Sequence, residues 1–138
     1  MRIRDAIQED VEWIVDYLAK DMFSLVGLEG FYNTQYLKEE FVPNLVANHV
    51  CLVAEEEKPV GCVGGIITQA MYNPDLVVLS ELFWWVAEEK RSGLVGAKLL
   101  HAFDKRGKEI DVDYISMSLM PSSNVNINAM TKRGYTLT

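Results

Sequence analysis

Apolar side chains recur along the first part of the chain with the spacing of an amphipathic helix. After a short strand expected at residues 3–6, an acidic stretch at residues 8–12 suits the positive end of a helix dipole. The apolar positions three or four residues apart are Val11, Ile14, Val15 and Leu18. A second helix is expected to begin near Thr34, and Pro43 must bend or split it because proline has no amide hydrogen to donate.

A different pattern, rich in β-branched residues, follows the second helix. Residues 50–55 and 60–68 flank a short charged turn, so they are expected to pair as a hairpin. Close approaches of the backbone are expected at Gly61, Gly64 and Gly65. Residues 76–86 are too apolar for a strand with one wet face, which predicts a central strand of the sheet. Only Ser80 and Glu81 interrupt that run.

The last third of the chain alternates helix, strand and helix. Residues 92–110 carry the strongest helical pattern, residues 114–120 are expected to form a strand, and a short helix is expected at residues 124–132. A trailing strand is expected after Gly134. This order predicts a single domain over residues 1–138 of the α/β (α+β) class, with three layers: a mixed central sheet and helices on both of its faces.

Composition narrows the classes of function. The 138 residues include 13 Lys and Arg against 20 Asp and Glu, so the net charge is −7, which argues against binding to nucleic acid or to anionic membranes. Apolar runs such as residues 82–87 are far shorter than the roughly 18 residues that span a membrane. The first residues lack the apolar core of a signal peptide. A cytoplasmic protein with no nucleic-acid or membrane partner is expected.

The cysteines and histidines offer no metal-binding pattern. Cys51 and Cys62 belong to no C-x-x-C pair and are interpreted as reduced thiols, with a disulfide between their neighbouring strands as the alternative. His49 and His101 have no second histidine or cysteine three or four residues away. No metal site is expected.

Positive charge is concentrated in one segment of this acidic chain. Residues 1–89 hold 5 basic and 16 acidic side chains, a net charge of −11, whereas residues 90–108 hold 6 basic and 1 acidic, a net charge of +5. At the start of the strongest helix, Gly93 and Gly96 would let phosphate oxygens approach unpaired backbone amides. The cations beside them are Lys90, Arg91 and Lys98. The alternative is a solvated basic helix, and the glycine spacing fits neither a P-loop nor a dinucleotide fingerprint.

This loop and helix start resemble the signature of the GCN5-related N-acetyltransferase (GNAT) superfamily, most closely its small bacterial and phage-borne members. The matching positions are Val86, Arg91, Gly93, Gly96, Leu99, Leu100, Gly134 and Tyr135. The order of elements matches the family nearly end to end. Glu88 stands where the family has proline, and Met130 stands where many members have a tyrosine that protonates the leaving thiolate.

The end of the chain also departs from the family. The sequence stops at Thr138, before the closing strands of the family are complete. Three explanations stay open: truncation, residues outside this sequence, or a strand supplied by a second copy in a homodimer.

The resemblance implies that acetyl-coenzyme A (acetyl-CoA) is the cofactor. Its diphosphate would lie at the helix start and its pantetheine arm along the splayed end of the central strand, where backbone amides would hold the thioester oxygen. The residues implied in cofactor binding are Trp84, Trp85, Val86, Arg91, Ser92, Gly93, Leu94, Val95, Gly96 and Asn124. The two tryptophans are open to a role in an acceptor pocket or in the core.

Glu81 is the candidate general base, because it is the only carboxylate in the run of residues 76–87. Burial on the same strand face as Phe83 or Trp85 would raise its pKa toward neutrality. The alternatives are a purely structural carboxylate, or a base one residue earlier, where this chain has Ser80. The candidates for the missing proton donor are Tyr114, Tyr72 and water.

The function expected from these features is transfer of an acetyl group from acetyl-CoA to a primary amine of a small molecule or protein, by direct attack in a ternary complex. The acidic first part of the chain favours a cationic acceptor such as a polyamine, an aminoglycoside or a lysine-bearing protein. Two alternatives stay open: a catalytically inactive binding module of the same fold, and a nucleotide-binding α/β domain that would prefer ATP to coenzyme A.

Overall fold

The strands form one mixed sheet in the order β1-β2-β3-β4-β5. The computed structural model describes residues 1–22, 27–28, 30–91, 93–119 and 125–138. Its strands are β1 (Arg2–Asp5), β2 (Val50–Glu55), β3 (Pro59–Ala70), β4 (Asn73–Val86) and β5 (Tyr114–Ser116). Neighbouring strands are antiparallel except β4 and β5, which are parallel.

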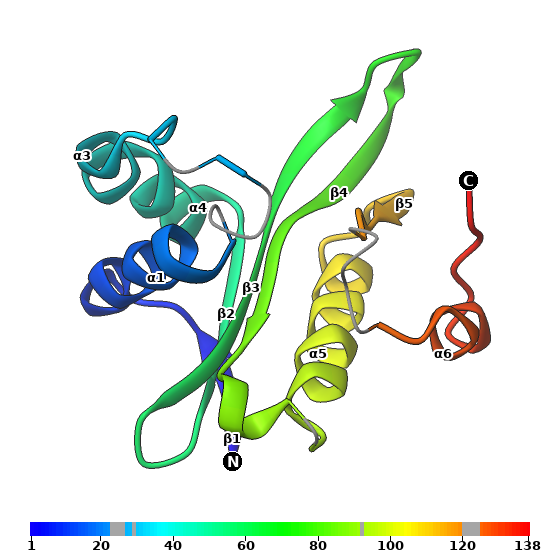
Figure 1. Cartoon of the computed structure of the whole chain (residues 1–138). Helices are drawn as coiled ribbons and strands as arrows, with labels where there is room; N and C mark the ends of the chain where they lie inside the picture. Colours follow the sequence, from blue (N-terminus) through cyan, green and yellow to red (C-terminus); the bar gives the residue numbers. More distant parts are fainter. Residues whose placement is uncertain (23–26, 29, 92, 120–124) are drawn as a thin grey trace.

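Helices cover both faces of this sheet (Figure 1). They are α1 (Val11–Tyr17), α3 (Thr34–Tyr36), α4 (Val42–Asn48), α5 (Val95–Glu109) and α6 (Ile127–Lys132). The helices α1, α3 and α4 lie on one face, α5 lies on the other, and α6 lies farther out beyond α5. The three-layer α/β arrangement is therefore confirmed. None of the helices in the described ranges is long and apolar enough to cross a membrane.

The first two helical segments are interrupted rather than straight. A 3₁₀ turn (Gln8–Asp10) precedes α1, and a π-helical turn (Leu18–Met22) follows it. A second π-helical turn (Leu37–Phe41) separates α3 from α4. Pro43 lies in the first turn of α4, where its missing amide hydrogen costs no hydrogen bond. The predicted split of this helix at the proline is therefore confirmed.

The glycines of β3 let α5 and β4 approach closely. A Cβ at Gly61 would lie 2.8 Å from the Trp85 carbonyl oxygen, and one at Gly65 would lie 2.7 Å from the Phe103 ring of α5. Both distances are too short for a real Cβ, so a side chain at either position would push the neighbouring element away. The predicted close approaches are confirmed.

β4 is an interior strand of the sheet, but it is not the middle one, which is β3. It pairs with β3 along most of its length, whereas it pairs with β5 only from Val78 to Ser80. β5 ends at Ser116 instead of continuing toward residue 120, which lies outside the described residues. Residues 76–86 are all buried or half-buried, so the predicted strand without a solvent-exposed face is confirmed, although β5 pairs with only three residues along its edge.

The trailing strand predicted after Gly134 is not present in the described part of the chain. Gly134 has a φ of +97° and follows α6, and the Tyr135 amide donates to the Met130 carbonyl oxygen. The Tyr135 hydroxyl donates to Asp104 of α5. These bonds hold the chain end against the helical layer rather than along the sheet edge.

The two cysteines are buried side chains on neighbouring strands. Cys51 lies opposite Gly64 and Cys62 lies opposite Val53, so the thiols are not directly paired. Burial raises the pKa of Cys51 to about 12 and raises that of Cys62 as well. Both thiols therefore stay protonated near neutral pH and act as small core side chains.

Candidate functional site

The pairing of β4 with β5 ends just before Glu81, and the unpaired edge of β4 that follows is called the opening below. The pairing of these parallel strands ends at Ser80 and Ser116. Beyond that point, the edge of β4 from residue 81 to residue 86 has no strand partner in the described part of the chain. Except for the Val86 carbonyl oxygen, which accepts a hydrogen bond from Arg91, its outward-pointing backbone groups are therefore available to a ligand that lies along the strand.

A β-bulge in β4 lies at the same place. On the β3 side, Gly64 pairs with Phe83 and Gly65 pairs with Glu81, which leaves Leu82 as an extra residue in β4. Such a bulge bends its strand and increases the local twist. The bulge thus accompanies the divergence of β4 from β5.

The bulge also decides on which face of the sheet Glu81 lies. Paired residues of antiparallel strands share a face, and Gly65, the partner of Glu81, faces Phe103 of α5. Phe83 and Trp85 lie on the opposite face, toward α1. The expectation that Glu81 shares a face with these aromatic residues is therefore wrong, because Leu82 shifts the alternation by one residue.

The Glu81 carboxyl has a pKa close to neutral pH. Burial raises this pKa to about 7, and a long hydrogen bond from the Ser118 amide, 3.5 Å to Oε2, lowers it by a smaller amount. No Lys or Arg in the described residues forms an ion pair with this carboxyl. The predicted rise in pKa is therefore confirmed, and its cause is desolvation on the α5 face.

The two tyrosines considered as proton donors contact each other. The hydroxyl oxygens of Tyr72 and Tyr114 are 2.6 Å apart, and this hydrogen bond raises the pKa of Tyr114. Tyr114 pairs with Val78, three residues before Glu81, which is about 10 Å along a strand. Neither hydroxyl has a hydrogen bond with Glu81 in the described structure.

Tyr135 is a further tyrosine near Glu81. The sequence indicates it only as part of the match of Gly134 and Tyr135 to the GNAT family. Its pKa is raised by burial, by its hydrogen bond to Asp104 and, more weakly, by the charge of Glu81. The hydroxyl is therefore near enough to sense Glu81, but it already donates to a carboxylate. Met130, at the position where many GNAT members have tyrosine, is buried in α6.

The first turn of α5 presents backbone amides without a side-chain cap. Leu94 is the N-cap residue, and its apolar side chain accepts no hydrogen bond. The first hydrogen bond of the helix runs from the Lys98 amide to the Leu94 carbonyl oxygen, at 2.9 Å. The amides of Val95, Gly96 and Ala97 have no acceptor among the described residues. These amides and the helix dipole favour an anion.

A pocket of about 330 Å³ lies at this helix start. The backbone of residues 93–95 and two lysines, Lys90 and Lys98, form part of its wall. Two carboxylates, Glu56 and Glu89, line it as well. A hydrogen bond and ion pair with Glu56, at 2.9 Å, raise the pKa of Lys90, so Lys90 stays protonated and faces an opposite charge. Lys98 is the lysine of this wall without a carboxylate partner in the described structure.

The Arg91 side chain points away from this pocket. Its Nε donates to the Val86 carbonyl oxygen at 2.8 Å, and its Nη2 lies 3.7 Å from Oδ2 of Asp21. The same Asp21 oxygen accepts a 2.7 Å hydrogen bond from Nε1 of Trp85. Asp21 therefore ties the segment after α1 to the end of β4 and to the loop that leads into α5.

Trp84 and Trp85 lie on opposite faces of β4. Trp85 is only 9% exposed and stacks on Tyr17, with ring centroids 3.8 Å apart. Trp84 packs beside Gly96 at the start of α5, and its buried Nε1 has no hydrogen-bond partner among the described residues. The two indoles therefore do not wall one common pocket, and the unpaired Trp84 N–H is buried beside Gly96, next to the first turn of α5.

Gly93 and Gly96 are not required by the packing of the chain. A Cβ at Gly93 would lie 3.6 Å from the Lys90 carbonyl oxygen, and one at Gly96 would lie 3.6 Å from Val86. Both distances are ordinary van der Waals contacts, and neither glycine has a positive φ. The bare backbone leaves room for ligand oxygens against uncapped amides. These residues therefore fit the diphosphate of coenzyme A.

Two of the residues implied in cofactor binding, Ser92 and Asn124, lie outside the described residues. The structure brings the others to the end of β4 and the start of α5. Within that set, the side chain of Trp85 is part of the core and that of Arg91 is held by Val86 and Asp21.

Solved structures match this chain over nearly its whole length, although no protein-family model and no curated protein matches it. A predicted acetyltransferase with acetyl-CoA from Clostridium acetobutylicum has a TM-score of 0.78 at 17% identity, covering 99% of this chain and 90% of that one. Glucosamine-6-phosphate N-acetyltransferase from Arabidopsis thaliana has a TM-score of 0.73 at 15% identity, with coverages of 99% and 92%.

A transcriptional regulator from Bacillus halodurans also matches, with a TM-score of 0.76 at 17% identity and coverages of 98% and 92%. At such identities the likeness concerns the fold. The chain therefore has the α/β, GNAT-like fold that the sequence led us to expect.

Proposed function

We propose that this protein is an N-acetyltransferase that moves an acetyl group from acetyl-CoA to a primary amine. The position of Glu81 carries the proposal. A carboxyl with a pKa of about 7 lies where β4 separates from β5, on the strand that leads into the uncapped start of α5. The acetyltransferase-type fold supports the same function.

Two regions of the chain are proposed to hold the cofactor. The amides of Val95, Gly96 and Ala97 would donate to the diphosphate, and Lys98 would add a positive charge. The unpaired edge of β4, residues 81–86, offers backbone groups to the amides of the pantetheine arm. The buried indole N–H of Trp84 is a further donor at the helix start.

The chemical roles follow from this placement. Acetyl-CoA, when bound, supplies a thioester whose carbonyl carbon an amine can attack. Glu81 accepts the proton that the acceptor ammonium must lose, directly or through one water. A backbone amide on the edge of β4 donates to the carbonyl oxygen, where negative charge grows during attack. When the carbon–sulfur bond breaks, the thiolate leaves, and the second proton of the attacking nitrogen passes to it directly or through water. A thiol pKa of about 8.5 makes the thiolate a good leaving group, so no side-chain acid is needed at Met130.

The acceptor is proposed to be a cationic amine. The segment of residues 1–89 carries a net charge of −11, and its exposed carboxylates include Glu12 and Asp16 on α1. Lys38 forms ion pairs with both of these carboxylates, at 3.9 and 3.3 Å, but it neutralises only part of the charge. The remaining negative field favours the approach of a polyamine, an aminoglycoside or a lysine-bearing protein.

A catalytically inactive module of the same fold is the second candidate. One observation favours it: the Arg91 guanidinium is held by Val86 and Asp21 instead of facing the pocket. Such a module would bind coenzyme A without transferring an acetyl group.

Thiol release from acetyl-CoA in the presence of a broad amine panel tests the proposal. We expect release that depends on the amine, together with an acetylated amine detected by mass spectrometry. Glu81→Gln should abolish it, whereas the matched control Asp75→Asn, at an exposed carboxylate of β4 outside the opening, should not. Tight coenzyme A binding without transfer to any amine would support the inactive module and overturn the enzyme.

A further inference from the structure

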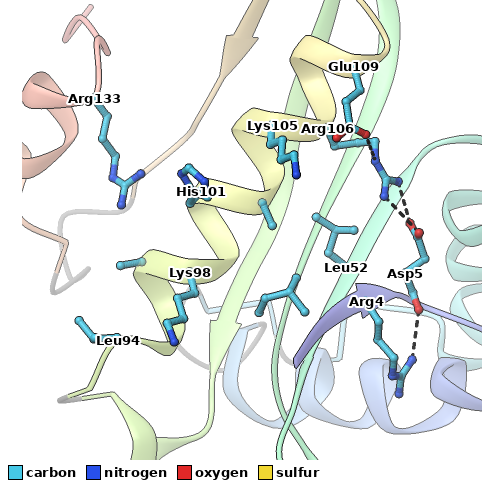
Figure 2. A pocket seen from close by; sticks show the side chains of 13 residues that line it. Arg4, Asp5, Leu52, Leu94, Lys98, His101, Lys105, Arg106, Glu109 and Arg133 are labelled. Atoms are coloured by element: carbon cyan, nitrogen blue, oxygen red, sulfur yellow. Dashed lines mark hydrogen bonds and ion pairs between the residues drawn. The ribbon is translucent and has the colours of Figure 1, made fainter. Parts of the chain in front are cut away.

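A second groove, of about 600 Å³, runs along the outer face of α5 (Figure 2). One of its walls is formed by β1 and β2, and Arg133, next to the end of α6, closes it on the other side. It shares Leu94 and Lys98 with the pocket at the helix start, but neither Glu81 nor the open edge of β4 lines it. It is therefore a different surface from the proposed catalytic opening.

Free positive charge gathers along this groove. Lys98, His101 and Lys105 occupy positions i, i+3 and i+7 of α5, so they form one stripe on the helix. Figure 2 shows Arg133 reaching from the other side toward His101. Lys98, Lys105 and Arg133 have no carboxylate within ion-pair distance in the described part of the chain.

The opposite wall of the groove is electrically balanced. Arg106 pairs with Asp5 at 2.7 Å and with Glu109 at 3.5 Å. Arg4 pairs with Asp10 at 2.7 Å. The net positive field of the groove therefore comes from the stripe on α5 and from the residue across it, on a chain whose net charge is −7.

The floor of the groove is apolar. It includes Ile3, Leu52, Ala97 and Ala102, of which Leu52 is only 2% exposed. An inorganic anion would leave these side chains uncovered. A ligand that matches the groove needs apolar groups for the floor and several negative charges for the rim.

The spacing of the charges sets the length of the ligand. Lys98 and Lys105 are seven residues apart on α5, which is about 10 Å along the helix axis. A ligand that pairs with both lysines in extended conformations must span that length, which a small dianion does not. A second helix has the same rise per residue, so carboxylates at its positions i, i+3 and i+7 would match the stripe when the two helices pack side by side.

We propose that this groove binds an acidic amphipathic helix of a protein partner. The apolar face of that helix would cover the exposed Ala97 and the half-buried Ala102, while its carboxylates would pair with the stripe on α5 and with Arg133. Complementary charge would also speed association and make it dependent on salt. The inference is independent of acetyl transfer, because no residue of the catalytic opening takes part in it.

The probe is a synthetic fluorescein-labelled amphipathic helix with glutamates at positions i, i+3 and i+7, and a control peptide carries glutamines there. Fluorescence anisotropy measures binding to the full chain. Lys105→Glu and Arg133→Glu should each weaken binding by roughly tenfold. Lys108 on α5 and Lys132 on α6 are exposed and do not line the groove. The control variants Lys108→Glu and Lys132→Glu should therefore each change the affinity for the peptide by less than about twofold.

Several outcomes would overturn the proposal. They are no binding of the acidic peptide, equal binding of the glutamine peptide, and equal losses in the Lys108 and Lys132 variants. Complete displacement of the peptide by coenzyme A would assign the groove to the cofactor, and a dimer of the protein that the peptide dissociates in analytical ultracentrifugation would assign it to a second copy of this chain. Coenzyme A binding is measured in Lys105→Glu as well. If that variant loses the peptide and still binds coenzyme A, the groove is distinct from the cofactor site of the proposed enzyme.

Discussion

The glycines of β3 and the glycines before α5 have opposite relations to the fold. A Cβ at Gly61 or Gly65 would come within 3 Å of a neighbouring atom, because α5 and β4 lie directly against β3. A Cβ at Gly93 or Gly96 would meet nothing closer than 3.6 Å. Packing therefore explains the first pair, whereas nothing in the chain itself explains the second.

Asp10 and Glu81, two carboxylates with reduced solvent access, show the same contrast. Asp10 accepts hydrogen bonds from Arg4, from the Ile7 amide and from Trp13, all between 2.7 and 3.0 Å. Glu81 has one hydrogen bond of 3.5 Å and no ion pair in the described structure. Residues that the fold does not explain thus gather where β4 opens and α5 begins, which is where a functional site is expected.

Glu81→Gln is expected to have the largest effect. The substitution removes the proposed base and keeps the size of the side chain, so kcat should fall by about 10²–10⁴. Coenzyme A affinity should stay within about twofold, because Glu81 is not a cofactor donor. Thiol release and calorimetry measure the two quantities. Asp10→Asn is the matched control: it should lower the melting temperature and keep kcat, and a loss of kcat in both variants would erase the contrast.

The pH dependence of stability gives the next largest effect. Because the pKa of Glu81 rises from 4.5 to about 7 on folding, the native state binds this proton more tightly than the unfolded chain. Its contribution to the free energy of unfolding is complete below pH 4.5 and is lost as the pH rises through 7, by at most about 3 kcal/mol. Urea unfolding should show this loss in the wild type and not in Glu81→Gln; identical curves would contradict it.

Gly65→Ala should act first on stability. The new Cβ would lie 2.7 Å from the Phe103 ring and 2.9 Å from the Ser80 carbonyl oxygen. Such overpacking should lower the free energy of unfolding by about 1–3 kcal/mol. Denaturant unfolding measures the change, with Gly93→Ala as the control that keeps wild-type stability. An unchanged midpoint for Gly65→Ala would show that packing does not explain the β3 glycines.

Gly96→Ala should have the reverse profile. Alanine favours the helix, so stability should stay the same or rise by up to about 1 kcal/mol. The added methyl group would keep phosphate oxygens away from the amides of the first turn, and coenzyme A should bind roughly tenfold more weakly. Thermal unfolding and calorimetry measure the two changes. Loss of stability with unchanged affinity would place Gly96 with the structural glycines.

Asp21→Asn should have the smallest effect. The amide oxygen can still accept the hydrogen bond from Trp85, whereas the half-exposed ion pair with Arg91 is lost. Stability should therefore change by less than about 1 kcal/mol. Removal of a negative charge beside Arg91 should tighten coenzyme A binding by about two- to threefold. Weaker binding in a calorimetric titration would show that Asp21 supports the cofactor site instead of opposing it.

Most of the fold could be predicted from the sequence because its periodicity is local. Residues 50–55 match β2, and Pro43 splits its helix for a reason that any proline carries. The prediction of a trailing strand was wrong because a contact between distant residues places the end of the chain. The bond from Tyr135 to Asp104 joins residues far apart in the chain, and no local pattern of residues contains it.

The site was predicted less completely, because it depends on register and on long side chains. Leu82 looks like any other apolar strand residue, yet as a bulge it turns Glu81 to the α5 face. Arg91 is close in sequence to the anion site, but its guanidinium reaches back to Asp21, whose position depends on a π-helical turn. A rotamer of this kind is set by the folded neighbours and not by spacing.

Titration of coenzyme A into isotopically labelled protein, followed by two-dimensional NMR, tests the cofactor site most directly. We predict saturable shifts of the amides of residues 93–97 and of the Trp84 indole N–H, which lacks a partner in the described structure. The Trp13 indole, which donates to Asp10 at 2.9 Å, should not move. No shifts, or shifts confined to the outer groove around Lys105 and Arg133, would contradict the site at the start of α5.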